Sequence, residues 1–88
     1  MFSEFGRRVA ENASKGTDHG TANVVMVLNE NLKKKGLYNA PADLLNLEHE
    51  DLKFSVDFRQ IYSTLLERWL GADARKILGD AFDGLGFI

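Results

Sequence analysis

Hydrophobic residues recur at helical spacing in the segment that follows Asp57. Seven of them fall at successive three- and four-residue steps on one helical face: Phe58, Ile61, Tyr62, Leu65, Leu66, Trp69 and Leu70. Asp57 precedes them as a candidate N-cap, and Gln60 follows at the position of the returning partner in a capping box. The pattern predicts an amphipathic helix that ends at Gly71, with a shorter second helix from about Asp73 to Leu78.

Nearer the N-terminus the apolar residues form a continuous run. The run Val24–Leu28 has no polar alternation, as expected for a strand that is buried on both faces of a sheet. Before it, Ser3–Asn12 has apolar residues one helical turn apart and predicts a short helix, and Ser14–Gly20 predicts a loop. The alternating stretch 52–56 predicts a short extended piece.

The region between the apolar run and the alternating stretch, residues 29–51, is rich in Asn, Lys and Gly. We expect it to be mostly loop, with room for one helical turn at Pro41–Leu45. The order of about three helices and one buried strand with short partner strands predicts an α/β fold. A central strand needs neighbours, and this sequence supplies at most one or two short ones. We therefore interpret residues 1–88 as a single partial domain, with part of its sheet missing upstream.

Composition and charge narrow the classes of partner. A formal net charge of −2 gives no general attraction to phosphate backbones or anionic lipid, so neither nucleic acid nor a membrane is expected as a partner. The basic run Lys33–Lys35 has no interleaved aromatic residues and is typical of a solvated turn. The absence of cysteine means that any metal must be held by nitrogen and oxygen ligands.

Candidate chemistry is concentrated in the glycine-bounded segment Gly16–Gly20. Asp18 and His19 carry oxygen and nitrogen ligands suited to zinc, manganese or iron, and the two glycines give the backbone freedom to fold around an ion. On spacing alone a surface turn is the favoured interpretation. Two ligands are also fewer than the three or more that a hydrolytic metal site uses.

Two further polar clusters contain residue types that are common in functional sites. Arg7 and Arg8 suit bidentate binding of an oxyanion, and a surface ion pair with Glu4 or Glu11 is an equally good interpretation. The acidic cluster 48–51, which includes His49, has ligand-type residues without glycine or an apolar shell, and a solvated loop is favoured there.

Four motifs taken together resemble a known family. They are Ser3-Glu4-Phe5-Gly6-Arg7-Arg8, Gly16-Thr17-Asp18-His19-Gly20, Asp57-Phe58-Arg59-Gln60-Ile61-Tyr62 and Trp69-Leu70-Gly71. Their order and spacing resemble the C-terminal end of the bacterial sulfatase-like family called domain of unknown function 1501, within the alkaline phosphatase superfamily. The resemblance covers almost the whole chain.

The resemblance implies the C-terminal part of an alkaline-phosphatase-like α/β/α sandwich that is several times longer than this chain. His19 looks like a late metal-binding His, and Glu4 stands where relatives place a metal-binding acid. A rival alignment makes Asp18 and His19 an adjacent ligand pair. The family implies a divalent metal (zinc, manganese or iron) in the full-length parent, and its members are often exported by the twin-arginine route.

The function implied by this resemblance is that of the C-terminal portion of a metal-dependent phosphatase or sulfatase-like hydrolase, inactive as an isolated fragment. Its first partner would be the missing N-terminal part of its own domain, and the fragment is expected to self-associate. The alternative is a non-catalytic small interaction module that dimerises through its Trp69-bearing amphipathic helix.

Overall fold

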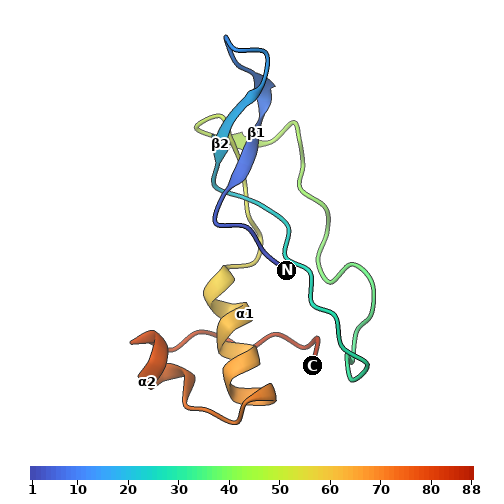
Figure 1. Ribbon diagram of the computed structural model, residues 1–88, viewed down its shortest axis with the longest axis vertical. Helices are drawn as coiled ribbons and strands as arrows, with labels where there is room; N and C mark the ends of the chain where they lie inside the picture. The colour runs from blue at the N-terminus through green and yellow to red at the C-terminus, as the bar shows by residue number, and fades with distance from the viewer. The chain divides into compact units, whose positions relative to one another are not determined.

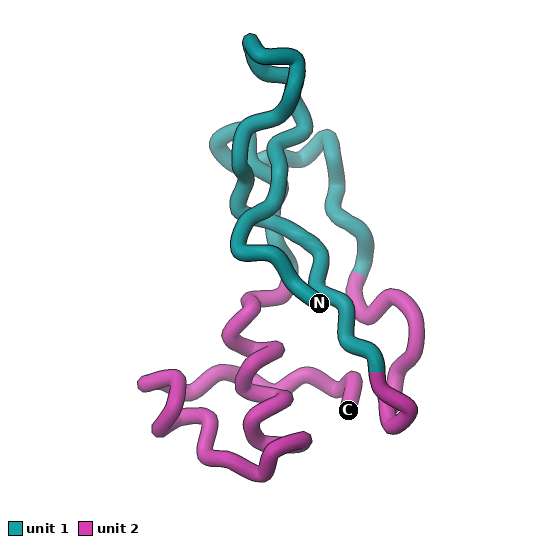
Figure 2. Tube along the Cα trace, viewed as in Figure 1, with its two compact units in different colours: residues 1–28, 40–55 teal, residues 29–39, 56–88 magenta.

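The computed structural model describes residues 1–88 and is a mixed α/β structure with two small antiparallel sheets and two α-helices. Figure 1 shows the elements in chain order, which are β1 Gly6–Glu11, β2 Thr17–Gly20, β3 Leu47–Glu48, β4 Asp51–Leu52, α1 Phe58–Thr64, the π-helical turn η1 Leu65–Trp69, and α2 Ala74–Leu78. The chain divides into two compact units, which Figure 2 colours separately. Unit 1 comprises residues 1–28 and 40–55, and unit 2 comprises residues 29–39 and 56–88.

Unit 1 is built on the hairpin of β1 and β2, whose register places Gly6 opposite Gly20 and Arg7 opposite His19. The side chain of Asn12 organises the connection, because its Oδ1 accepts hydrogen bonds from the backbone amides of Ser14 and Gly16, each at 3.0 Å. The helix predicted for 3–12 and the loop predicted for 14–20 are therefore wrong where these strands form. A spacing of four residues places side chains on one face of a strand as well as of a helix, so the pattern was ambiguous.

The second hairpin of unit 1 joins β3 and β4 through His49 and Glu50. Both residues have positive φ, 48° and 70°, as a two-residue type I′ turn requires. The extended piece predicted for 52–56 is confirmed only at its start, where β4 ends at Leu52. No helical turn forms at 41–45, since the Asp43 carboxylate accepts a hydrogen bond from the Leu45 amide at 2.9 Å and closes a local turn instead.

The apolar run Val24–Leu28 is not a buried central strand, so that prediction is wrong for this chain. The segment belongs to neither sheet, and the side chains of Val24 and Leu28 are 73% and 89% exposed. The physical reason is the lack of neighbours, because each sheet consists of one two-stranded hairpin and the run pairs with neither. Consequently the structure is mixed α/β without a central layered sheet.

Unit 2 begins with helix α1, which confirms the capping box expected from the sequence. The Asp57 carboxylate accepts a hydrogen bond from the Arg59 amide at 2.9 Å, and the Asp57 amide donates to Gln60 Oε1 at 3.1 Å. After Thr64 the helix continues as the wider turn η1, in which the Leu70 amide donates to the Leu65 carbonyl at 3.0 Å. Helix α2 confirms the second predicted helix, with Asp73 as N-cap and a left-handed Gly79 at its end.

Helix α1 buries its polar side. Ser63 and Thr64 are 1% exposed, whereas Phe58 and Trp69 on the apolar stripe are 58% and 52% exposed. The chain after α2 covers the polar side, because the Ser63 hydroxyl donates to the Phe82 carbonyl and the Thr64 hydroxyl accepts from the Leu85 amide. The amphipathic stripe is thus present but largely open to solvent. No helix has the length and apolar character needed to cross a membrane.

Candidate functional site

The hairpin of β1 and β2 brings the two N-terminal motifs of the sequence together. Arg7 pairs with His19 across the strands. The Phe5 ring stacks on the His19 imidazole, with 3.7 Å between ring centroids and 14° between ring planes. The Arg7 guanidinium lies 5.3 Å from the centroid of the same Phe5 ring and donates from Nη1 to the Thr17 carbonyl at 2.7 Å. An exposed imidazole is therefore oriented by an aromatic ring and flanked by a cation.

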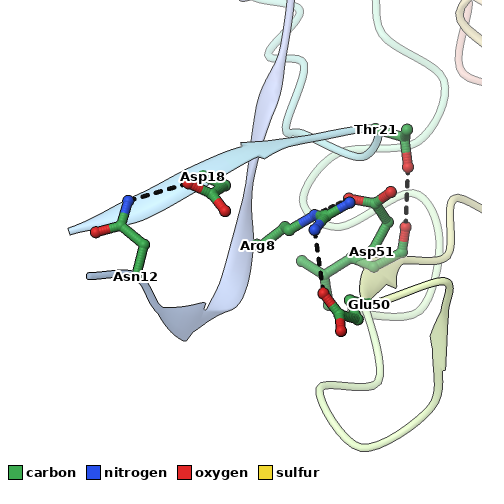
Figure 3. A network of polar contacts seen from close by, with 7 residues as sticks. Arg8, Asn12, Asp18, Thr21, Glu50 and Asp51 are labelled. Carbon is green, nitrogen blue, oxygen red and sulfur yellow. Dashed lines mark hydrogen bonds and ion pairs between the residues drawn. The ribbon is translucent and has the colours of Figure 1, made fainter. Parts of the chain in front are cut away.

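Asp18 does not join His19 on this face. Successive side chains of a strand point to opposite faces of the sheet. The Asp18 carboxylate accepts a hydrogen bond from Asn12 Nδ2 at 3.1 Å, and Figure 3 shows it directed toward Asn12. The glycine-bounded segment forms strand β2 from Thr17 to Gly20, so the loop that would have turned both ligands toward one ion is not formed.

Glu4 precedes β1, is exposed, and has no hydrogen bond or ion pair. No group of three or more His, Asp and Glu side chains lies close enough together to hold a metal ion. The three residues expected as ligands, Glu4, Asp18 and His19, therefore do not converge on one point. A metal bound at His19 would need ligands that this arrangement does not supply.

Arg8 is engaged by the second hairpin of unit 1. Its Nε donates to Asp51 Oδ1 at 3.0 Å and its Nη1 to Glu50 Oε2 at 3.2 Å, as Figure 3 shows. The hydrogen bond and charge of Asp51 raise the pKa of the Arg8 guanidinium further above its ordinary value. Its carboxylate partners are thus Asp51 and Glu50 in place of Glu4 or Glu11. The Arg7 guanidinium instead contacts the Thr17 carbonyl and the Phe5 ring, so the two arginines have separate partners and do not form a joint oxyanion site.

The sequence does not indicate the structural roles of two residues of this region. Phe5 belongs to an apolar spacing and to the first motif of the family resemblance, and neither indicates that its ring stacks on His19. Asn12 was read as the end of a helix, although it closes the hairpin and holds Asp18. Asn favours turns because its side chain accepts a hydrogen bond from the amide two residues on, and this signal at Asn12 could have located the hairpin. Nothing in the spacing pointed to the stacking of Phe5.

Comparisons with protein-family models, with curated proteins and with solved structures found no match to this chain.

Proposed function

We propose that this chain is the C-terminal portion of a metal-dependent phosphatase or sulfatase-like hydrolase and that it contributes His19 as a metal ligand. In this proposal the chain is one segment of a larger α/β/α sandwich. The observation that carries it is the hairpin register, which places Arg7 beside His19 and so joins two of the four motifs on which the family resemblance depends. Arg7 and His19 are twelve positions apart in the sequence, yet they lie side by side and are both exposed.

The chemistry of the cluster supports this role for His19. Stacking on Phe5 fixes the plane of the imidazole and leaves its side chain exposed, as a ligand completed by other residues requires. A divalent metal held there would polarise a phosphoryl or sulfuryl oxygen or activate a water molecule. The nearby Arg7 guanidinium is exposed and is suited to bind the negatively charged ester group.

The isolated chain should not hydrolyse esters under this proposal, because it gathers fewer than three ligand side chains. The test begins with the coding sequence upstream of Met1, followed by expression of the longest continuous reading frame. That protein is assayed with aryl phosphate and aryl sulfate esters, with zinc, manganese or iron supplied separately. We expect metal-dependent hydrolysis by the longer protein.

The chain offers a matched control, since it contains two histidines, both exposed. In the longer protein, His19→Ala should abolish hydrolysis and lower the bound metal content. His49→Ala should leave both unchanged, because His49 lies in the β3–β4 turn and is not a ligand in this proposal. The proposal is refuted if the longer protein is active and His19→Ala does not change its activity. It is also refuted if the longer protein binds no metal and is inactive.

A second candidate function is favoured by a separate observation in unit 2. Helix α1, η1 and α2 form an almost wholly apolar groove lined by Tyr62, Leu65, Leu66, Ile77 and Leu78. The groove continues the exposed stripe that carries Phe58, Trp69 and Leu70. We propose as the alternative a non-catalytic interaction module that dimerises through this stripe, because apolar helix faces of this kind pack against similar faces.

The two candidate functions predict different coding sequences upstream of Met1. A start codon at Met1 preceded by a ribosome-binding site favours the module, whereas an open frame that continues upstream favours the hydrolase segment. Dimerisation alone does not separate them, because a segment of a larger domain can also self-associate through its uncovered surfaces.

A further inference from the structure

The apolar run Val24–Leu28 has one edge that already behaves as a paired strand. The Met26 amide donates to the Met1 carbonyl at 2.8 Å, and the Met1 amino group donates to the Met26 carbonyl at 2.6 Å. This reciprocal exchange is the pattern of a hydrogen-bonded pair in an antiparallel ladder. Figure 1 shows the N-terminus beside this extended stretch of chain.

The opposite edge of the same run has no partner. In an extended chain the amide and carbonyl groups of alternate residues point to opposite edges, so those of Val25 and Val27 face away from Met1. No hydrogen bond joins the backbone of either residue. The run has high β-propensity and contains no charge, proline or glycine, so it has none of the features that protect natural edge strands from pairing.

We propose that this free edge pairs with the same edge of a second copy of the chain, as an antiparallel two-stranded ribbon centred on Met26. In this register Met26 faces Met26 of the partner subunit across the two-fold axis. Val25 exchanges both backbone hydrogen bonds with Val27 of the partner subunit, and Val27 does the same with Val25 of the partner subunit. The interface is isologous, as a closed dimer requires.

The register follows from the direction of the backbone groups. A slip of one residue would set Val25 against a residue whose amide points toward the other edge, so the ladder would lose its donors. A slip of two residues restores the donors but places Val27 against Asn23 of the partner subunit, or Val25 against Asn29 of the partner subunit. Only the register centred on Met26 sets all five apolar residues against apolar residues.

Charge and exposure also favour a second copy as the occupant. The first charge beyond the run is Glu30, which in this register meets Ala22 of the partner subunit, so no like charges are opposed. Val24 is 73% exposed and would lie opposite Leu28 of the partner subunit, which is 89% exposed in the single chain. The pairing would shield the side chains that are now in water, and it does not depend on the hydrolase proposal.

Cysteine cross-linking tests the register, because the chain has no native cysteine. Residues in a non-hydrogen-bonded antiparallel pair have Cα atoms about 4.5 Å apart, within the range of a disulfide. We expect Met26→Cys to form a disulfide dimer under mild oxidation. Val24→Cys is the matched control, since the two copies of residue 24 would lie roughly 14 Å apart along the ribbon and should not cross-link.

A mixture of the Val24→Cys and Leu28→Cys chains should cross-link to one another, whereas neither should cross-link to itself. Sedimentation equilibrium of the unmodified chain should show a mass approaching twice 9.9 kDa as concentration rises. Val25→Pro removes a donor from the free edge and should abolish the dimer, whereas Val24→Pro removes an amide on the Met1 edge that makes no hydrogen bond and should preserve it.

A chain that stays monomeric at all concentrations would overturn the proposal. So would equal cross-linking of Met26→Cys and Val24→Cys, which would show pairing without this register. The proposal is also overturned if the dimer persists in Val25→Pro but dissociates in Trp69→Ala, because the helix would then be the dimer interface.

Discussion

Gly6 is the residue whose surroundings leave the least room for change. It is buried in β1, and a Cβ atom added there would lie 1.6 Å from the Ala22 carbonyl oxygen. Gly6→Ala should therefore force the backbone apart and destabilise unit 1 by about 1–3 kcal/mol, the usual cost of overpacking. Urea unfolding measures this loss. Gly16→Ala is the control, because its nearest neighbour would be Asn12 Oδ1 at 3.9 Å, and an equal loss in both variants would contradict the close approach at Gly6.

Asp57 should make the stability of unit 2 depend on pH in the acid range. Its hydrogen bonds from the Arg59 side chain and backbone lower its pKa from 3.8 to about 2. A carboxyl whose pKa is lower in the folded than in the unfolded chain contributes stability that is complete above pH 3.8 and is lost as the pH falls through about 2.

Asp57→Asn keeps a side chain that can cap the helix but removes the charge, so it should flatten this part of the pH profile. Helical circular dichroism during thermal unfolding, recorded at intervals between pH 5 and pH 2, provides the measurement. An unchanged profile in the Asn variant would assign the acid sensitivity to other carboxyl groups.

Single residues differ in how far the sequence reveals their partners. The cap formed by Asp57 and Gln60 was predicted in detail, because both partners lie within one turn of the same helix. The pairing of Arg8 with Glu50 and Asp51 was not, because these residues are more than 40 positions apart and meet only after both hairpins have formed. Hydrogen bonds within one helical turn can be predicted from sequence spacing, whereas ion pairs between distant residues cannot.

Among the elements, the β3–β4 hairpin has a turn that its sequence suits poorly. His49 and Glu50 both have positive φ, a conformation that favours Asn and Gly. His49→Asn should relieve this strain and stabilise unit 1 by roughly 1 kcal/mol, leaving Glu50 in place as a partner of Arg8. Chemical denaturation followed by circular dichroism tests it, with Glu48→Asn as a control in strand β3 where no gain is expected.

The packing of helix α1 against the C-terminal chain depends on the Thr64 hydroxyl. It donates to the Gln60 carbonyl at 2.7 Å and accepts from the Leu85 amide at 2.8 Å. Thr64→Val keeps the shape and removes both bonds, so it should destabilise unit 2 by about 1–3 kcal/mol. Thr64→Ser keeps the hydroxyl and should cost less. If the two variants are equally stable by thermal unfolding, the hydroxyl does not hold this contact.

An element can be predicted from the sequence when the interactions that form it join residues close together in the chain. Helices α1 and α2 were expected because their caps and terminal glycines are local signals. The segment 3–12 was assigned to a helix because Phe5 and Val9 suit either period, and only pairing with β2 decides for a strand. The run Val24–Leu28 is apolar, but the prediction of a buried central strand is wrong, because burial depends on neighbours that spacing does not supply.

For the molecule as a whole, the main feature is how little apolar side chain is buried. Ala74 and Phe87 are the buried hydrophobic residues, while Trp69 is half exposed and other large apolar side chains are exposed in both units. Trp69 should therefore fluoresce like a partly hydrated indole and be quenched by iodide. If the chain associates through the strand edge, this emission should not change with concentration, whereas packing of the helix stripe would shift it to shorter wavelength and reduce quenching.

The sequence predicted which residues belong to the candidate site, but not how their side chains are arranged in space. The sequence singled out Gly16–Gly20 and the segment containing Arg7, and the hairpin does bring Arg7 and His19 together. It did not foresee that a strand would direct Asp18 away from His19, because the choice between loop and strand at Gly16–Gly20 depends on pairing with β1. Metal ligation by His19, Asp18 or Glu4 stays a prediction that the tests above address.

The π-helical turn η1 has a consequence for how the chain can vary in length. Its hydrogen bond spans five residues, from the Leu70 amide to the Leu65 carbonyl, so the turn holds one residue more than an α-helical turn. Loss of the exposed residue Glu67 would restore an ordinary turn and leave the capped start of α1 unchanged. The turn is thus a place where a one-residue deletion would rotate Trp69 and Leu70 about the helix axis without disrupting α1.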